Sequence, residues 1–291
     1  MPRSLRGSRS PGRPAARCRA RRRCSGTWPA ATERDPHVTD FLSGGFGPFG
    51  WAVILATFLL AGFVKGVIGL GLPTVAVGLL ATVMAPAHAA ALLIVPSFVT
   101  NIWQLLAGPG VGALTRRLWP MMAAIAAGTV ASAGLIAGAT GRGPAGALGL
   151  ALVAYAATGL AGLSLRVPAR AEPWLSPLVG LATGLVTGAT GVFVIPAVPY
   201  LQALNLGRDD LIQALGLSFT VSTVALAAGL AREGALPLAA GAASLVALAP
   251  ALLGMAAGQW LRGRVSAQTF RRAFLVGLLL LGAHLAVRLW L

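Results

Sequence analysis

The sequence predicts an all-α membrane protein with about eight transmembrane segments in two tandem repeats of four, the first segment of each repeat being broken by glycine and proline. Hydrophobic residues make up 56% of the 291-residue chain and charged residues only 10%, whereas about a quarter of a soluble protein is charged. The apolar stretches are also long, since Lys65 is the only charged residue between Gly50 and Val111. About 20 such residues cross the core of a bilayer.

Eight apolar segments account for nearly all of the chain after residue 50. Each is a continuous run without the alternation of a membrane β-strand, so its backbone must satisfy its own hydrogen bonds as a helix. The connections contain Gly, Pro and Arg and are too short for an extramembrane domain. The predicted spans lie near residues 50–83, 86–107, 119–139, 144–165, 174–204, 208–230, 236–260 and 270–290.

The formal net charge of +16 indicates membrane topology rather than nucleic-acid binding. Ten of the 23 basic residues lie before Asp35, and the others sit mostly in short connections. A nucleic-acid binder needs a basic face on a folded domain, and the predicted fold leaves no soluble domain to carry one. Positive charge beside membrane spans instead marks the cytoplasmic side. We therefore expect a lipid bilayer around the protein and no nucleic acid as a partner.

Residues 1–37 are rich in Arg, Ser, Pro, Gly and Ala and predict a disordered tail. Both cysteines, Cys18 and Cys24, lie in it without a nearby histidine, so they have no metal-site spacing. Val38 is followed by Thr and Asp and resembles a natural start, since valine codons can initiate translation in bacteria. Our hypothesis is that 1–37 is an over-extended start, and detection of a peptide from this segment by mass spectrometry would contradict it.

An internal repeat relates residues 50–165 to residues 174–290. The pattern G-x-x-x-G-x-x-G begins at Gly62 and again at Gly184, 122 residues later, and each copy is followed within five residues by a proline. Further matches in the same order pair Ser97-Phe98 with Ser218-Phe219, and Gly134 and Gly138 with Gly254 and Gly258. Two-fold internal repeats are typical of secondary transporters, whose substrate site lies at the repeat interface.

The first segment of each repeat is predicted to break in the middle. Proline suits the first turn of a helix, so Pro73 and Pro196 are expected to open short second half-helices whose N–H groups form an anion site. Paired broken helices are the best sequence indication of a transport site. The alternative is that the glycines only let helices pack closely, and the two roles are compatible. The glycines concerned are Gly66, Gly69, Gly71, Gly188 and Gly191.

Lys65 is the only lysine of the chain and lies about fifteen residues into the first segment, beside the glycine break. A lysine at the centre of a span costs about 2.5–3.5 kcal/mol on the insertion scale, which makes it a functional candidate. The alternative is that its amine extends to the membrane interface. Its partner in the second repeat is Thr187, so that repeat supplies no matching charge.

Asp209 and Asp210 stand at the very start of the segment 208–230 and no acidic residue lies deeper in a predicted span, which disfavours a cation site or a carboxylate proton relay. The composition favours an anion pathway lined by hydroxyls and amides, without a metal or another cofactor and without catalytic residues. Local hydrogen bonding and packing are the alternative for each single hydroxyl. Ser97, Thr100, Asn101 and Gln104 share one helix face, and the other candidates are Thr190, Ser218, Ser222 and Thr223.

Several of these stretches resemble the TauE/SafE family of sulfite exporters. The resemblance covers roughly residues 50–290 and is carried by residues 61–73 and 91–104 in the first repeat and by 180–196 and 215–222 in the second. It implies a multi-pass protein of the bacterial cytoplasmic membrane that exports sulfite, a sulfonate or a related organic anion. The chain departs from the family at Thr190-Gly-Val-Phe-Val194, where more glycines are common, so the substrate stays open.

The basic residues give conflicting indications of topology. The tail, together with Arg116 and Arg117, predicts a cytoplasmic N-terminus, but eight full crossings would then place Arg262, Arg264, Arg271 and Arg272 outside. Either a broken segment turns back within the membrane or the rule fails once. The sequence leaves this open, as it does the orientation of the repeats, the coupling ion and the oligomeric state.

Two other classes of function were considered. An intramembrane serine hydrolase would use Ser218 with His284, but the chain lacks G-x-S-x-G and its spacing supports neither a base nor an oxyanion hole. A subunit of a larger membrane complex without transport activity is the other alternative. The sequence favours a transporter over both, because a buried lysine beside broken helices indicates a site.

Overall fold

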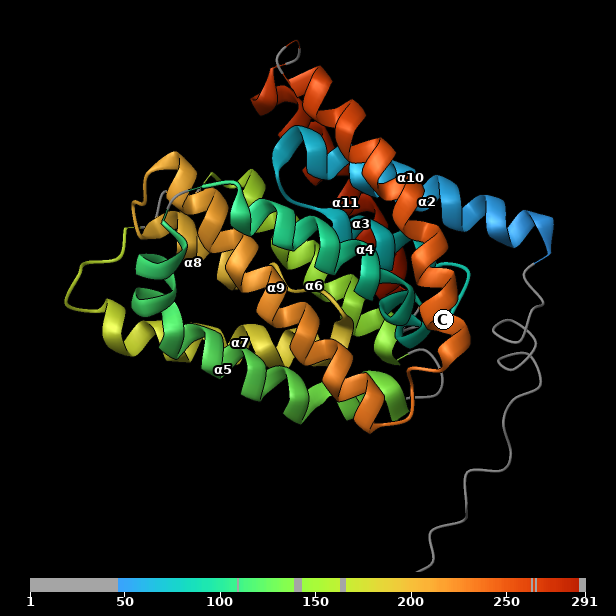
Figure 1. Ribbon diagram of the computed structural model, residues 1–291, viewed down its shortest axis with the longest axis horizontal. Helices are drawn as coiled ribbons and strands as arrows, with labels where there is room; N and C mark the ends of the chain where they lie inside the picture. Colours follow the sequence, from blue (N-terminus) through green and yellow to red (C-terminus); the bar gives the residue numbers. More distant parts are fainter. Residues whose placement is uncertain are drawn as a thin grey trace, which may run out of the picture.

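A computed structural model describes residues 47–108, 110–138, 143–162, 166–262, 264 and 266–287. The predicted tail, residues 1–37, and the proposed start at Val38 lie outside this part. All regular structure of the described residues is helical, and Figure 1 shows the helices packed side by side in one bundle. The predicted all-α fold is therefore confirmed.

Ten helices are described, and each predicted segment corresponds to one helix or to a broken pair. They are α2 (Pro48–Ile68), α3 (Leu72–Leu80), α4 (Pro86–Leu106), α5 (Val111–Gly138), α6 (Gly143–Leu160), α7 (Glu172–Thr190), α8 (Ala197–Ala203), α9 (Arg208–Arg232), α10 (Leu238–Arg262) and α11 (Ala267–Val287). Seven of them, all except α3, α7 and α8, are long and apolar enough to cross a membrane. The described residues thus support a multi-pass protein with seven candidate spans.

The start of α5 differs from the prediction by eight residues. The helix begins at Val111 rather than near residue 119, so Arg116 and Arg117 belong to it. Hydropathy marks only the apolar part of a helix, whereas backbone hydrogen bonds can continue beyond it. The Arg117 guanidinium donates to the Glu172 carboxylate at 2.6 Å, which joins the start of α5 to the start of α7.

Both predicted breaks are present. Helix α2 ends at Gly69, and Gly71 precedes α3; their φ angles of 82° and 105° are left-handed and favour glycine. Pro73 lies in the first turn of α3, where its missing N–H leaves no helical bond unmade. Helix α7 likewise ends at Gly191, with a φ of 73°, and Pro196 immediately precedes α8. The prediction that these prolines open second half-helices is confirmed.

Close glycine contacts join α2 to α10 and α7 to α5. A Cβ atom at Gly66 would overlap the Met255 carbonyl oxygen, and one at Gly188 would lie 2.5 Å from the Thr129 oxygen. Gly62 and Gly184 make similar contacts one turn earlier. Because contacts advance along both helices together, each pair runs parallel. Gly66 and Gly188 therefore have the packing role that was one of their two interpretations.

The bundle has one end that is rich in arginine. The hydrogen bond from Gln104 Nε2 to the Ile212 oxygen, at 3.1 Å, places the end of α4 beside the start of α9. The ends of α6, α8 and α10 meet the starts of α9 and α11 around shared cavities. We call this the arginine end. The arginines carried there are Arg116, Arg117, Arg166, Arg170, Arg262, Arg264, Arg271 and Arg272.

The chain turns back inside both broken segments. Helix α2 runs toward the arginine end, parallel to α10, and α3 leads away from it to the start of α4 (Figure 1). Helices α7 and α8 do the reverse. This geometry favours the first of the two topological alternatives, a segment that turns back, and it places Arg117 and Arg271 at the same end of the bundle.

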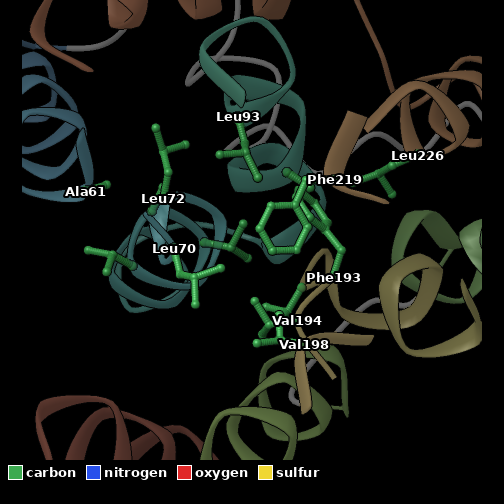
Figure 2. Packing of buried hydrophobic residues seen from close by; sticks show 14 of the residues in the cluster. Ala61, Leu70, Leu72, Leu93, Phe193, Val194, Val198, Phe219 and Leu226 are labelled. Atoms are coloured by element: carbon green, nitrogen blue, oxygen red, sulfur yellow. The ribbon is translucent and has the colours of Figure 1, made fainter. Parts of the chain in front are cut away.

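The cluster of buried hydrophobic side chains extends through the bundle and includes residues of both breaks. Figure 2 shows Leu70 from the first break near Phe193 and Val194 from the second, with Phe219 of α9 beside them. The rings of Phe193 and Phe219 are 5.7 Å apart. The two breaks are thus held together by apolar packing at the centre of the fold.

Candidate functional site

Lys65 lies in the last turn of α2 and only 4% of its surface is exposed. Helix α2 ends three residues later, and the Gly69 N–H donates to the Lys65 carbonyl oxygen at 2.7 Å. The carbonyl end of a helix carries a partial negative charge, which stabilises a nearby ammonium group. The burial argues against the alternative in which the Lys65 amine extends to the membrane interface.

The Lys65 amine is held by α4. Its Nζ donates to Thr100 Oγ1 at 3.0 Å and also to Asn101 Oδ1. A protonated lysine has three N–H donors, and the described residues supply acceptors for two of them. No carboxylate pairs with this amine, because the salt bridge between Arg117 and Glu172 is the only one among the described residues.

Hydrogen bonds continue from Asn101 into α9. Asn101 Nδ2 donates to Ser97 Oγ at 3.0 Å and to Thr223 Oγ1 at 3.4 Å, and the two hydroxyls are 3.2 Å apart. Asn101, Ser97 and Thr100 have no exposed surface. We call Lys65, Ser97, Thr100, Asn101 and Thr223 the lysine network. It connects α2, α4 and α9 in the interior of the bundle.

Helix α4 is fixed at this point by α10. Pro96 has no N–H, so the carbonyl oxygen of Leu92, four residues earlier, lacks its helical donor. Ser244 Oγ of α10 donates to that oxygen at 2.7 Å and accepts the Val95 N–H at 3.1 Å. This bridge holds the turn that presents Ser97 and Asn101.

Ser218 and Ser222 lie one helical turn apart on α9. Neither has exposed surface, and neither hydroxyl has a hydrogen-bond partner among the described residues; Thr129 is the third such case. A buried polar group without a partner costs about 1–3 kcal/mol, so it invites a functional explanation. Gly229, two helical turns after Ser222 on the same face of α9, packs against α5, whereas Gly216 and Thr223 face α4; Ser222 therefore lies on a different side of α9 from the lysine network.

The second break is occupied by local contacts. Thr190 Oγ1 donates to the Val186 oxygen at 2.7 Å and accepts the Val192 N–H at 3.2 Å. A Cβ atom at Gly191 would touch Ala90 and Val77. No hydrogen bond of Thr190 within the described part reaches the lysine network, so the structure does not join these two groups of predicted site residues.

The two glycines of the first break have different surroundings. A Cβ atom at Gly71 would lie 3.0 Å from Val64 and 3.1 Å from Phe274, so this side of the break is apolar. Gly69, in contrast, lines a cavity of about 570 Å³. The two breaks contact each other through apolar side chains, and the first also adjoins this cavity, which is lined in part by polar residues.

The hydrolase alternative lacks the contact that it requires. Ser218 Oγ has no base within hydrogen-bond distance among the described residues, and His284 lies exposed on α11. Likewise, no group of three His, Cys, Asp or Glu side chains that could hold a metal ion occurs among the described residues.

Sequence reasoning missed three features of this region. It placed Thr223 among the lining residues but did not predict its hydrogen bond with Asn101. It did not single out Ser244, which bonds the Leu92 carbonyl oxygen. It also interpreted Arg262 and Arg271 as topology signals only, although both line the cavity beside Gly69. The presence of Pro96 inside an apolar run was a usable signal for Ser244, because the unpaired carbonyl needs a donor from another helix.

Comparison with known proteins gives one family match. The sequence model of the family described as Sulfite exporter TauE/SafE matches residues 54–285, which is most of the chain. No curated protein and no solved structure matches the chain significantly. The family is one of transporters and not of enzymes.

Proposed function

We propose that this chain, which belongs to the TauE/SafE sulfite exporter family, exports a small anion such as sulfite, a sulfonate or a related organic anion across the bacterial cytoplasmic membrane. The observation that carries the proposal is the Lys65 amine, which is buried and has no carboxylate partner among the described residues.

A charge taken out of water is stabilised by an opposite charge or by a complete set of hydrogen bonds. Thr100 and Asn101 satisfy only two of the three donors of a protonated Lys65. An anion bound beside Nζ would accept the third and neutralise the charge. The proposed contact residues are therefore Lys65 and the lysine network around it.

Ser218 and Ser222 are proposed to contribute further donors. Their hydroxyls are buried and unpartnered on the helix that also carries Thr223. A buried hydroxyl that donates to an anion no longer carries the free-energy penalty of an unmade hydrogen bond. Bound substrate would therefore remove this penalty at both serines. The backbone near Gly69 and Gly191 remains a proposed second source of donors, through the ends of the broken helices.

We also propose that the two halves are inverted repeats. A Cβ atom at Gly254 would lie 2.8 Å from the Phe63 nitrogen, and a Cβ atom at Gly128 would lie 3.1 Å from the Leu185 nitrogen. Phe63 and Leu185 are equivalent positions of the two repeats, because they are 122 residues apart. Gly254 therefore corresponds to Gly128, and not to Gly134 as the order of glycines in the sequence indicated. Since α2 runs toward the arginine end and α7 away from it, the repeats have opposite directions, as in many secondary transporters.

The arginine end is proposed to face the cytoplasm, following the excess of basic residues in cytoplasmic connections. Arg117, Arg166 and Arg271 lie there, whereas Arg232 at the end of α9 lies at the opposite end. In this orientation α2 begins outside the cytoplasm, which is the reverse of the expectation from the basic tail. Labelling of cysteines introduced at Gly112 and Gly241 from each side of intact cells would test the assignment.

Flux measurements in proteoliposomes test the proposed function. Radiolabelled sulfite, sulfate, a small sulfonate and a carboxylate would be compared, with wild type, Lys65→Met and Arg272→Gln. We expect flux of at least one anion that Lys65→Met abolishes and Arg272→Gln, an exposed charge outside the network, preserves. Absence of flux for every anion from folded wild-type protein would contradict the proposal and favour a subunit role.

A further inference from the structure

A cavity of about 570 Å³ opens at the arginine end beside the first break. Its inner wall contains buried residues, among them Val67, Leu70 and Gln104, while Gln268 and Arg271 at its edge are exposed. The cavity therefore leads from the surface of the arginine end into the bundle. Of the proposed substrate contacts, Gly69 borders this cavity, but no role has been given to its arginines.

The inner wall of this cavity adjoins the lysine network. Val67 follows Lys65 by two residues on α2, and Gln104 follows Asn101 by three on α4. With a rise of 1.5 Å per residue, these offsets correspond to about 3–5 Å along each helix. The cavity thus ends about one helical turn from the proposed substrate site, on both helices that form it.

The cavity presents cationic and amide groups without an acidic one. Arg262 and Arg271 line it together with the amides of Gln104, Gln202 and Gln268, and no Asp or Glu does. Asp209 and Asp210 begin α9 nearby, but among the described residues the one ion pair joins Arg117 and Glu172. The two guanidinium groups are therefore uncompensated by the described residues.

A second cavity, of about 470 Å³, adjoins the first. The two share Gln202 and Arg271, and the second adds Arg166, Tyr155 and Asn205. Arg271 thus stands at the junction of both. Clefts lined by charge of one sign concentrate ions of the opposite sign near their walls, and a planar guanidinium can donate two parallel hydrogen bonds to one oxyanion.

We infer that the cavity around Arg262 and Arg271 is a separate binding site for a small, doubly charged oxyanion, which it captures at the arginine end before the anion reaches Lys65. The inference rests on the proposed function for its place in a transport path, but the binding itself can be measured without transport. The same chemistry would suit the phosphate of an anionic lipid, and the inference commits to the free oxyanion.

The test is equilibrium binding of radiolabelled sulfate to the full chain in nanodiscs of phosphatidylcholine, which has no net charge. We expect saturable binding with a cavity component that Arg271→Gln weakens about tenfold, in line with the loss of a charge-assisted bidentate pair. The double variant Arg262→Gln, Arg271→Gln should remove that component and leave any binding at Lys65. Arg272→Gln is the matched control, because it removes the neighbouring arginine, which lines neither cavity. It should bind sulfate within about twofold of wild type.

Lys65→Met separates this inference from the proposed function. It should keep sulfate binding within about threefold of wild type, because the cavity is distinct from the lysine network, while it loses flux. Unchanged binding in the double arginine variant would overturn the inference and leave the transport proposal standing. If the wild-type protein binds sulfate in an arginine-dependent way but shows no flux, the binding inference stands and the transport proposal is contradicted.

A lipid arm decides the source of the oxyanion. Protein in nanodiscs that contain phosphatidylglycerol would be analysed by native mass spectrometry, for wild type and Arg271→Gln. Retention of phosphatidylglycerol that depends on Arg271, together with no sulfate binding in phosphatidylcholine, would overturn the inference in favour of a lipid site. Each variant would first be shown to be monodisperse, with a melting temperature close to that of wild type.

Discussion

The two breaks of the molecule share a backbone design and differ in their chemistry. At both, a helix ends in a left-handed glycine, Gly69 or Gly191, and a proline begins the next short helix. In the first, Lys65 reaches across to α4 and bonds Thr100 and Asn101. In the second, the corresponding Thr187 bonds back to the Thr183 oxygen of its own helix at 2.7 Å.

The surroundings differ in the same way. The first break borders a cavity with two arginines, whereas the second is filled by Phe193 and Val194, which pack toward Phe219 (Figure 2). The same kind of helix end at a left-handed glycine is thus compatible with a polar, open side and an apolar, closed side. We infer that the repeated glycines determine the backbone of both breaks. Residues outside the repeated pattern then make the first break polar and suited to binding, and the second break apolar and closed.

The largest expected difference between the breaks concerns transport. Lys65→Met should reduce flux by on the order of a hundredfold, since removal of one partner of a buried charge contact costs about 2–5 kcal/mol. Thr187→Val, at the corresponding position, should leave flux within about threefold of wild type, because its hydroxyl bonds only the nearby backbone oxygens of Thr183 and Val192. Initial rates in proteoliposomes measure both. Equal losses in the two variants would contradict the functional asymmetry.

The glycine contacts should instead be symmetric. Gly66→Ala and Gly188→Ala each place a methyl group against backbone of a neighbouring helix, and such overpacking costs about 1–3 kcal/mol. Melting temperatures of the purified variants measure the effect. Gly277→Ala is the control, since nothing lies within 4 Å of a Cβ atom there. A marked loss of stability in only one of the two glycine variants would show that the halves are not packed alike.

Ser97→Ala should have a smaller effect on stability. It removes the acceptor of the Asn101 amide at 3.0 Å and the contact with Thr223, a loss of about 1 kcal/mol for a typical buried hydrogen bond. Denaturation of the reconstituted protein, compared with Ser97→Thr, measures it. If Ser97→Ala is as stable as wild type, the lysine network does not hold α4 against α9.

Ser222→Ala should have the smallest effect on folding and a selective effect on the substrate. Its hydroxyl has no partner in the described part of the chain, so removing it should leave the melting temperature unchanged or slightly raised. The concentration of anion for half-maximal flux should rise by about three- to tenfold, as for one lost hydrogen bond. An unaltered half-maximal concentration would assign Ser222 to packing alone.

The sequence predicted the breaks well because glycine and proline act locally. The positive φ angles of Gly69 and Gly191, and the place of Pro73 in a first turn, depend on a few neighbouring residues. The predicted face with Ser97 and Asn101 is likewise buried, since helical periodicity alone selects it. The number of candidate spans was less well predicted, because a chain that turns back looks like one long apolar run.

The remaining features depend on distant parts of the chain. That Asn101 would bond Lys65, 36 residues away, and Thr223, 122 residues away, follows from packing that no local pattern specifies. The same applies to Ser244, which completes α4 from α10. The arginines of the cavity were visible in the sequence, but a short connection gives no indication of which helix ends will meet around it.

The most direct test of the account uses the fact that Lys65 is the only lysine in the chain. Lysine labelled with ¹³C at Cε and ¹⁵N at Nζ then gives one side-chain signal in the NMR spectrum of the protein in micelles. Titration with sulfite, sulfate or a small sulfonate should shift that signal saturably, and Arg272→Gln should leave the shift unchanged. A transported anion that leaves the Lys65 signal unmoved at saturation would contradict the claim that this amine binds the substrate.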